Sequence, residues 1–253
     1  MYKDAIVRKP AESAVQGLTS VNLGRPDFDL LLSQWQNYVD TLKQLQLRVT
    51  ELESLHDFPD AYFVEDPAII VPEIAVMMRS GAKSRRDEPE HIIDSIRNFR
   101  ALERINCPGT LDGGDVLIVG KHCIVGLSER TNHAGAEQLA TILAEYDYHT
   151  DIVDVPEALH FKSNVNFLDE NTLLMTQSCY WMDCISKYRK LVVPEEEAYA
   201  ANVVAINNHI LAPEGFDGTI RLLQENAYNV IPMPVSEIRK MDGGLTCLSL
   251  RII

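Results

Sequence analysis

The chain repeats one plan at intervals of 42 to 48 residues. Each interval opens on a turn with a polar residue and continues as strand, strand, helix and strand. The residues that mark the openings are Asp66, Asp112, His160, Asn202 and Cys247. Units of this size bury their apolar faces against their neighbours. With the N-terminal segment, the pattern predicts about five small α/β units in one closed ring, with helices outside and the openings converging on a central axis.

The composition fits a single domain. The 253 residues are 46% apolar, which is enough for a full hydrophobic core. A chain of this length can also form two domains. No Pro-, Gly- or Ser-rich linker divides it, so we expect one α/β domain over residues 1–253.

Charge and cysteine content narrow the classes of function. A net charge of −14 disfavours nucleic acid and anionic membranes as partners and is compatible with a small cationic substrate. No run of about 18 uncharged apolar residues is present, and the first six residues lack the apolar core of a signal peptide. Five scattered cysteines without a Cys-x-x-Cys pair favour reduced thiols and a cytoplasmic location.

Hydrophobic periodicity places the individual elements. A helix should begin at Asp27, a second should run from Pro89 along an apolar stripe that ends at Leu102, and a short one should occupy 182–188. Cys247 should stand at the entrance of the last strand. Further helices are expected near 132–144 and at 218–226, and strands at 5–8, 47–52, 68–71, 74–77, 116–119, 123–127, 151–154, 172–175, 203–206 and 209–212.

The residues at the unit openings suit nucleophilic catalysis. A cysteine nucleophile needs a general acid/base and an orienting group, and Cys247, His160 and Asp112 are of the right types. Histidine can protonate a leaving amine and then activate water. The nearby carboxylates of Asp66 and Glu65 would bind a guanidinium or another cation, and a bound cation would lower the pKa of the thiol.

Each of these residues also has a purely structural interpretation. Cys247 can be a small buried hydrophobe and His160 a strand-edge histidine. Asp112 flanks Gly-Gly, as turn residues often do. Arg85 and Arg130 lie in loops, where arginines are usually solvated. The sequence shows no ligand spacing typical of a zinc site, and neither a GxGxxG fingerprint nor a P-loop follows a predicted strand.

Six motifs in order carry a resemblance across essentially the whole chain. They are FVED at 63–66, GAKSRRDE at 81–88, TLDGGDV at 110–116, GLSERTN at 126–132, LHFKS at 159–163 and DGGLTC at 242–247. Together they closely resemble the dimethylarginine dimethylaminohydrolases. That family belongs to the guanidino-group-modifying (pentein) enzymes, so the resemblance implies a five-bladed, pseudo-symmetric α/β propeller, in agreement with the repeat.

The resemblance also implies roles for individual residues. Cys247 would be the nucleophile, His160 the acid/base, and Asp112 the acid that holds the guanidinium and orients the histidine. The implied substrate-binding residues are Asp60, Glu65 and Asp66 in the guanidino pocket, Arg85 and Arg130 as a clamp on the substrate α-carboxylate, and Leu18 in the lid. Phe161 stands where leucine is commoner in the family, and the fourth repeat is short.

The implied reaction is hydrolysis of a guanidino C–N bond. Attack by Cys247 on a methylated arginine would give a covalent S-alkylthiouronium, and water would release citrulline, with mono- or dimethylamine as the other product. The resemblance implies neither a metal nor an organic cofactor. The sequence leaves open whether the chain forms a homodimer.

Two other functions stay open at this point. An arginine deiminase, or another guanidino hydrolase of the same superfamily, would share the residues, although deiminases usually carry an extra helical insertion. A non-catalytic propeller that serves as a binding module is disfavoured, because it would lack the cysteine, histidine and acid that are present here.

Overall fold

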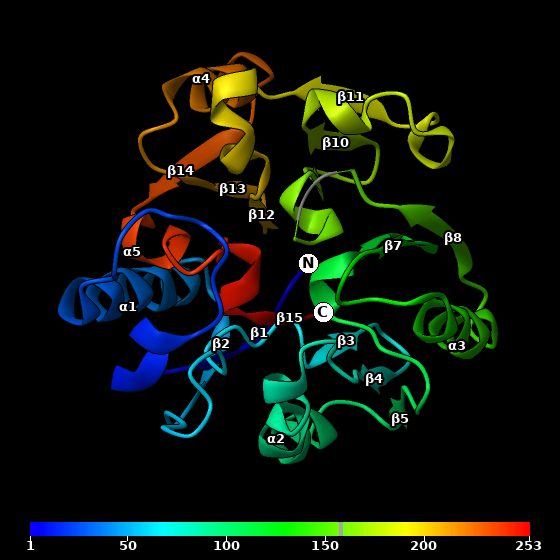
Figure 1. Cartoon of the computed structure of the whole chain (residues 1–253). Helices are drawn as coiled ribbons and strands as arrows, with labels where there is room; N and C mark the ends of the chain where they lie inside the picture. Colours follow the sequence, from blue (N-terminus) through cyan, green and yellow to red (C-terminus); the bar gives the residue numbers. More distant parts are fainter. Residues whose placement is uncertain (157–158) are drawn as a thin grey trace.

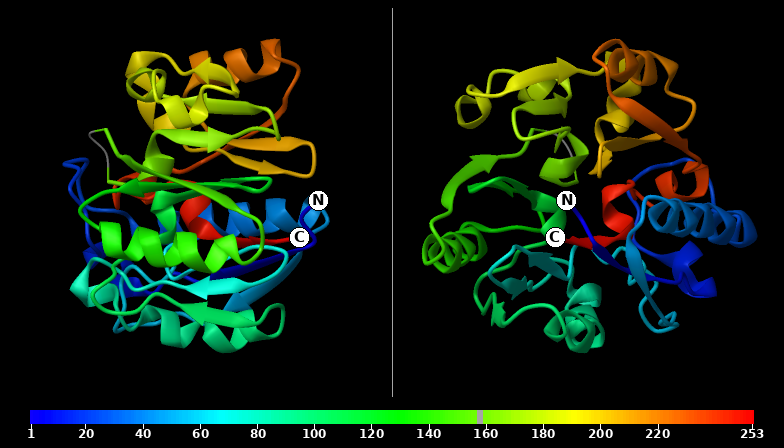
Figure 2. Two further views of the ribbon diagram at one scale, coloured as in Figure 1. Left: turned by 90° about the vertical axis from the view of Figure 1, so that its right-hand side faces the viewer. Right: turned by 180° about the vertical axis from the view of Figure 1, so that it is seen from behind.

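Five three-stranded sheets stand in a ring around one axis (Figure 1). The computed structural model describes residues 1–156 and 159–253. Helices lie on the outside of the ring, and both termini lie near the axis on one face (Figures 1 and 2). The α/β propeller expected from the repeat is confirmed.

Each sheet, or blade, follows one plan. The first strand pairs antiparallel with the middle strand, and the third strand pairs parallel with it. In blade order, the strands are β15 (Leu250–Ile252), β1 (Asp4–Arg8) and β2 (Arg48–Leu52); β3 (Ala68–Ile70), β4 (Ala75–Met77) and β5 (Leu102–Arg104); β6 (Val116–Val119), β7 (His122–Leu127) and β8 (His149–Asp154); β9 (Val165–Phe167), β10 (Thr172–Met175) and β11 (Arg189–Val192); β12 (Val204–Ile206), β13 (His209–Pro213) and β14 (Asn229–Met233).

Helices and 3-10 turns join the strands. The α-helices are α1 (Phe28–Gln44), α2 (Ile93–Arg97), α3 (His133–Ala144), α4 (Asp217–Glu225) and α5 (Ser236–Arg239). The 3-10 turns are η1 (Glu12–Gln16), η2 (Lys83–Arg85), η3 (Glu88–His91), η4 (Gly113–Asp115), η5 (Phe161–Ser163), η6 (Gln177–Cys179), η7 (Asp183–Ile185), η8 (Glu195–Ala201) and η9 (Thr246–Leu248). No helix among the described residues has both the length and the apolar character to cross a membrane.

The first blade closes the ring with strands from both ends of the chain. The C-terminal strand β15 takes the inner position, with Ile6 opposite Leu250 and Asp4 opposite Ile252. The middle strand β1 is buried at all five positions. Closure in this way leaves no unpaired inner strand between the first and last units of the chain.

Helix α1 begins where the sequence predicts. Asp27 caps it, because its side chain accepts a hydrogen bond from the Leu30 N–H at 3.0 Å. The inner face of α1 packs Leu31 and Trp35 into the largest apolar cluster, which also contains Tyr38. The Tyr38 hydroxyl lies 2.8 Å from Ser249 Oγ and so ties α1 to the segment before β15.

Two expected helices are wrong. The apolar stripe after Pro89 forms the turn η3 and one short α-helix, and Leu102 opens strand β5 instead. Pairing of β5 with β4 completes the second blade, and this tertiary requirement overrides the helical spacing. In the fourth blade, 182–188 contains only the turn η7, and Ile185 is its buried anchor.

The burial pattern of α1 gives a direct test of this packing. Leu31 is fully buried, whereas the adjacent Leu30 is 44% exposed. Leu31→Ala should lower the free energy of unfolding by about 2–5 kcal/mol because it opens a cavity in the core. Leu30→Ala is the matched control and should change it by less than about 0.5 kcal/mol. Denaturant melts of both variants check this, and equal effects would contradict the assigned face of α1.

Candidate active site

The polar residues at the unit openings meet at one end of the axis. Each lies shortly before the inner strand of a blade, because Asp66 precedes β3, Asp112 precedes β6, His160 precedes β9 and Cys247 precedes β15. His160 and Cys247 both line a cavity of about 200 Å³ and a smaller one of about 30 Å³. The repeat therefore brings together residues that are far apart in the sequence.

Cys247 lies in the turn η9, three residues before β15, rather than at the strand entrance itself. The Gly244 N–H donates to Cys247 Sγ at 3.4 Å. Asn202 fixes the turn, since its Oδ1 accepts from the Thr246 N–H at 3.1 Å. A Cβ on Gly244 would lie 2.4 Å from Asn202 Oδ1, so this close approach requires glycine.

The thiol is not activated in the resting site. Burial, together with the charges of Glu65 and Asp66, raises the pKa of Cys247 to about 12. The Gly244 N–H and Lys162 act in the opposite direction but are weaker. The thiolate therefore needs additional positive charge in the cavity before it can form at neutral pH.

His160 lies between carboxylates. Its Nδ1 is 3.2 Å from Asp115 Oδ2 and its Nε2 is 3.9 Å from Asp66 Oδ1. Asp115 is itself held by the hydroxyls of Thr131 and Ser128, at 2.6 and 2.7 Å. Asp115 therefore lies where a group that orients His160 would lie, and the orienting role of Asp112 stays a prediction. Like Asp112, Asp115 flanks the Gly113-Gly114 pair, and turn chemistry explains part of its presence there.

The carboxylates keep the imidazole charged. Burial alone would lower the pKa of His160, but Asp66, Asp115 and Asp112 outweigh it and raise the pKa to about 9. At neutral pH the resting site therefore pairs an imidazolium with a neutral thiol. This is the protonation state that a general acid needs.

Asp112 is fully buried and lines neither cavity. Its Oδ1 accepts from the Gly81 N–H at 3.2 Å, and its Oδ2 has no hydrogen-bond partner among the described residues. The nearest cation is Arg130, whose Nη1 is 3.8 Å from Oδ2. Burial raises the pKa of Asp112, and the neighbouring Asp66 adds to this. Its direct contact with a guanidinium stays a prediction.

Asp66 and Arg85 form a buried pair. Arg85 Nη1 lies 2.6 Å from Asp66 Oδ2, and its Nε and Nη2 bind Glu88 at 2.8 to 3.0 Å. Burial opposes ionisation of Asp66, but Arg85 and His160 lower its pKa to about 2. Most donors of Arg85 are therefore used inside the protein, although its side chain still lines the smaller cavity. The clamp role of Arg85 stays a prediction, and Arg130 is the less committed of the two.

Glu65 lines the larger active-site cavity with a buried carboxylate. Its carboxylate accepts from Lys162 at 2.6 Å, from Thr246 Oγ1 at 2.5 Å and from Arg251 at 3.3 Å. These contacts join three unit openings across the axis and separate the larger active-site cavity from a third cavity of about 100 Å³. Glu65 therefore acts mainly as a structural hub, and its contact with substrate stays a prediction.

A loop after η1 covers the smaller cavity. The Leu18 N–H donates to Asp60 at 3.0 Å, and the Leu18 side chain is exposed. Ser20 donates to Asp242 Oδ2 through both its N–H and its hydroxyl, at 2.5 and 2.9 Å. Asp60 and Asp242 thus hold the loop closed from two sides. Leu18 lines the smaller cavity, and its role in a lid stays a prediction.

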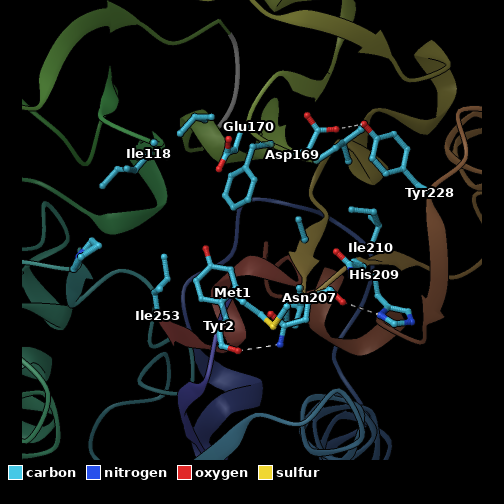
Figure 3. A pocket seen from close by; sticks show the side chains of 18 of the residues that line it. Met1, Tyr2, Ile118, Asp169, Glu170, Asn207, His209, Ile210, Tyr228 and Ile253 are labelled. Carbon is cyan, nitrogen blue, oxygen red and sulfur yellow. Dashed lines mark hydrogen bonds between the residues drawn. The ribbon is translucent and has the colours of Figure 1, made fainter.

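A larger hollow of about 910 Å³ lies at the other end of the axis, beside both termini (Figure 3). Its side chains are largely apolar or already paired, such as Tyr228 with Asp169 at 2.5 Å. No cysteine among the described residues lines it. Size alone therefore does not identify the reactive site.

Asp66, Asp112 and His160 place their potential ligand atoms within 4.8 Å of one another. Asp66 already binds Arg85, and the imidazole is protonated at neutral pH, so a metal would have to displace both a proton and an ion pair. An organic cation that donates hydrogen bonds fits these carboxylates better.

Comparison with known proteins agrees with the site. The arginine deiminase family profile matches residues 36–185. An N(G),N(G)-dimethylarginine dimethylaminohydrolase of Pseudomonas aeruginosa is 38% identical over 253 residues, which cover 99% of this chain and 100% of that one. One of Streptomyces coelicolor is 32% identical, with 99% and 97% covered.

Solved structures give the same result. A cysteine-to-serine variant of the Pseudomonas aeruginosa enzyme in complex with citrulline superposes with a TM-score of 0.98 at 37% identity and full coverage of both chains. A histidine-to-glycine variant of a dimethylarginine dimethylaminohydrolase, as an adduct with S-methyl-L-thiocitrulline, gives 0.97 at 37% identity, also with full coverage. The chain belongs to the dimethylarginine dimethylaminohydrolase family.

Proposed function

We propose that the protein hydrolyses the guanidino C–N bond of N-omega-methylated arginine to citrulline and a methylamine. The observation that carries this proposal is the meeting of Cys247, His160 and several carboxylates around the two active-site cavities. The thiol is the nucleophile, the imidazolium is the acid, and Asp66 and Asp112 supply negative charge for a cation. The single α/β propeller over 1–253 is the scaffold that we propose for this site.

The substrate itself completes the activation of the nucleophile. Its guanidinium brings a positive charge beside Cys247, where Glu65 and Asp66 otherwise oppose ionisation. That charge lowers the pKa of the thiol, and the thiolate then attacks the central guanidino carbon. The resulting tetrahedral adduct collapses as His160 protonates the departing amine.

The second half of the reaction uses the same imidazole. Loss of the amine leaves an S-alkylthiouronium on Cys247 and a neutral His160. The imidazole then takes a proton from water, the hydroxide adds to the carbon, and the C–S bond breaks to give citrulline and the thiolate. Protonation of the thiolate restores the resting site.

An arginine deiminase activity is the second candidate, and the profile match at 36–185 favours it. An arginine deiminase of Mycobacterium bovis matches only 48% of this chain at 29% identity. Release of citrulline and amine should be measured with arginine, monomethylarginine and asymmetric dimethylarginine. Faster ammonia release from arginine than methylamine release from the other two would overturn the proposed preference.

Covalent catalysis predicts a specific adduct. Cys247→Ser should abolish turnover while substrate still binds, because a hydroxyl is a much poorer nucleophile at neutral pH. Mass spectrometry of acid-quenched turnover should find the adduct on the peptide that holds Cys247. The exposed Cys107 is the matched control, and Cys107→Ser should remain fully active. An adduct on any other cysteine would rule out the assignment.

The protonation states predict the pH dependence. Attack needs a site that holds both a thiolate and an imidazolium. This state has one proton fewer than the resting site, which holds a thiol and an imidazolium. Because the pKa of His160 is about 9, kcat/KM should rise about tenfold per pH unit and level off near that value.

Two variants test the cause of this pH dependence. Asp115→Asn removes a charge that raises the pKa of His160, so the levelling-off should move to lower pH. Ser128→Ala removes hydrogen bonds to Asp115 and to the backbone N–H groups of Arg130 and Thr131 but no charge, so it should leave the levelling-off in place. A pH profile that does not move in Asp115→Asn would contradict the orienting role.

The two arginines should respond differently to truncation. Arg130→Ala should raise KM for amino-acid substrates about 10–100-fold with little change in melting temperature, as expected for loss of a charge-assisted hydrogen bond. Arg85→Ala should lower stability by about 3–5 kcal/mol, since it leaves Asp66 and Glu88 buried without their cation. Agmatine, which lacks the carboxylate, provides the control. An equal rise in its KM in Arg130→Ala would exclude the clamp.

A further inference from the structure

A cluster of two histidines and one carboxylate lies on the third blade, away from the active site. It consists of His122 at the start of β7 and of His149 and Asp151 at the start of β8. His122 pairs with Val119, at the end of β6 that is farthest from the Asp112 turn. The proposed reaction uses none of these three residues.

The register of the sheet brings the three side chains to one face. His122 lies directly opposite His149 in the parallel pair β7–β8, and Asp151 follows two residues later, where the side chain returns to the same face. Potential ligand atoms of all three lie within 4.8 Å of one another. Two strands that pair in register therefore build the cluster, so its geometry is fixed by backbone hydrogen bonds.

The three side chains lie close enough to surround one small divalent ion after local adjustment. His122 Nε2 lies 2.8 Å from Asp151 Oδ2, and His149 Nε2 lies 3.5 Å from Asp151 Oδ1. Zinc bonds of about 2.0–2.2 Å place neighbouring tetrahedral ligands roughly 3.3–3.6 Å apart. The His149–Asp151 spacing already fits this range, whereas the His122–Asp151 contact must lengthen when a metal binds. Small rotations of the exposed His149 ring would bring both imidazoles and the carboxylate around one centre.

A second residue orients the buried histidine. Tyr188 Oη lies 2.7 Å from His122 Nδ1, on the side of the ring opposite Asp151. Without a metal, Nε2–H donates to Asp151 and Nδ1 accepts from the Tyr188 hydroxyl. A metal on Nε2 would displace that proton, and Nδ1–H would then donate to Tyr188 Oη, as histidine ligands donate to outer partners in metal sites. A simple His122–Asp151 ion pair would need neither His149 nor this bond.

We propose that His122, His149 and Asp151 form a zinc site, with Tyr188 as the partner that orients His122. The site joins the third blade to the fourth, because Tyr188 directly precedes β11. Residues 165–192, all of which the structure describes, contain no α-helix, so the fourth blade has the least helical cover of the five. Zinc bound here stabilises this part of the ring and takes no part in the chemistry.

Equilibrium dialysis and thermal melts with zinc test the proposal. The chelator-treated protein should take up zinc, and its melting temperature should rise with zinc concentration. His149→Gln should weaken this binding by at least about 100-fold, and Tyr188→Phe by about 10–100-fold. Because His149 is exposed, its variant should fold normally. His133→Gln on α3 is the matched control and should bind like wild type, since it removes an exposed histidine that faces a single carboxylate, Glu137.

The active-site cluster requires a separate control. In His160→Gln, which removes the histidine of that cluster, the zinc-dependent rise in melting temperature should persist and should still be lost on adding His149→Gln. Loss of zinc binding in His160→Gln alone would place the metal in the active site and overturn the proposal. Binding by His149→Gln as tight as by wild type, or no uptake by the wild type, would also overturn it.

Discussion

The pairing of β15 with β1 is the contact on which the site depends. It places the C-terminal strand at the inner edge of the first blade, with Leu250 opposite Ile6. The same pairing sets the position of η9 and therefore of Cys247. Without it the histidine and carboxylates of the other blades would still converge, but no nucleophile would face them.

Buried charge determines how the site behaves before substrate arrives. Glu65 ties Lys162, Thr246 and Arg251 together across the axis, and Asp66 is satisfied by Arg85. Arg85 and His160 lower the pKa of Asp66 to about 2, so this carboxylate remains ionised although it is buried. The charges of Glu65 and Asp66 also help to raise the pKa of the Cys247 thiol, and a cation bound beside the thiol would lower it.

The repeat made most of the architecture predictable. The unit openings recur every 42 to 48 residues, and this spacing can be recognised even where the sequence does not settle whether a single segment is a helix or a strand. The helix predicted to extend to Leu102 is wrong, because apolar residues at helical spacing cannot reveal that β4 needs a partner strand there.

Cys247, His160 and Asp66 were predictable from their places at unit openings. The part played by Asp115 was not, because only the fold shows that its carboxylate turns toward His160 rather than toward the solvent side of a turn. The His122 cluster was also hidden, because its ligands lie on two strands 27 residues apart and meet only through their register.

One residue belongs both to the lid and to the turn that carries the nucleophile. Asp242 holds Ser20 through two hydrogen bonds and directly precedes the Gly243-Gly244 pair, whose second N–H points at Cys247 Sγ. Asp242 also has a positive φ of 56°, in the left-handed region that aspartate adopts more readily than most residues. Asp242 therefore links the loop that carries Leu18 to the turn that carries Cys247. A displacement of that loop that breaks the bonds to Asp242 would reach the backbone next to the nucleophile without passing through any blade.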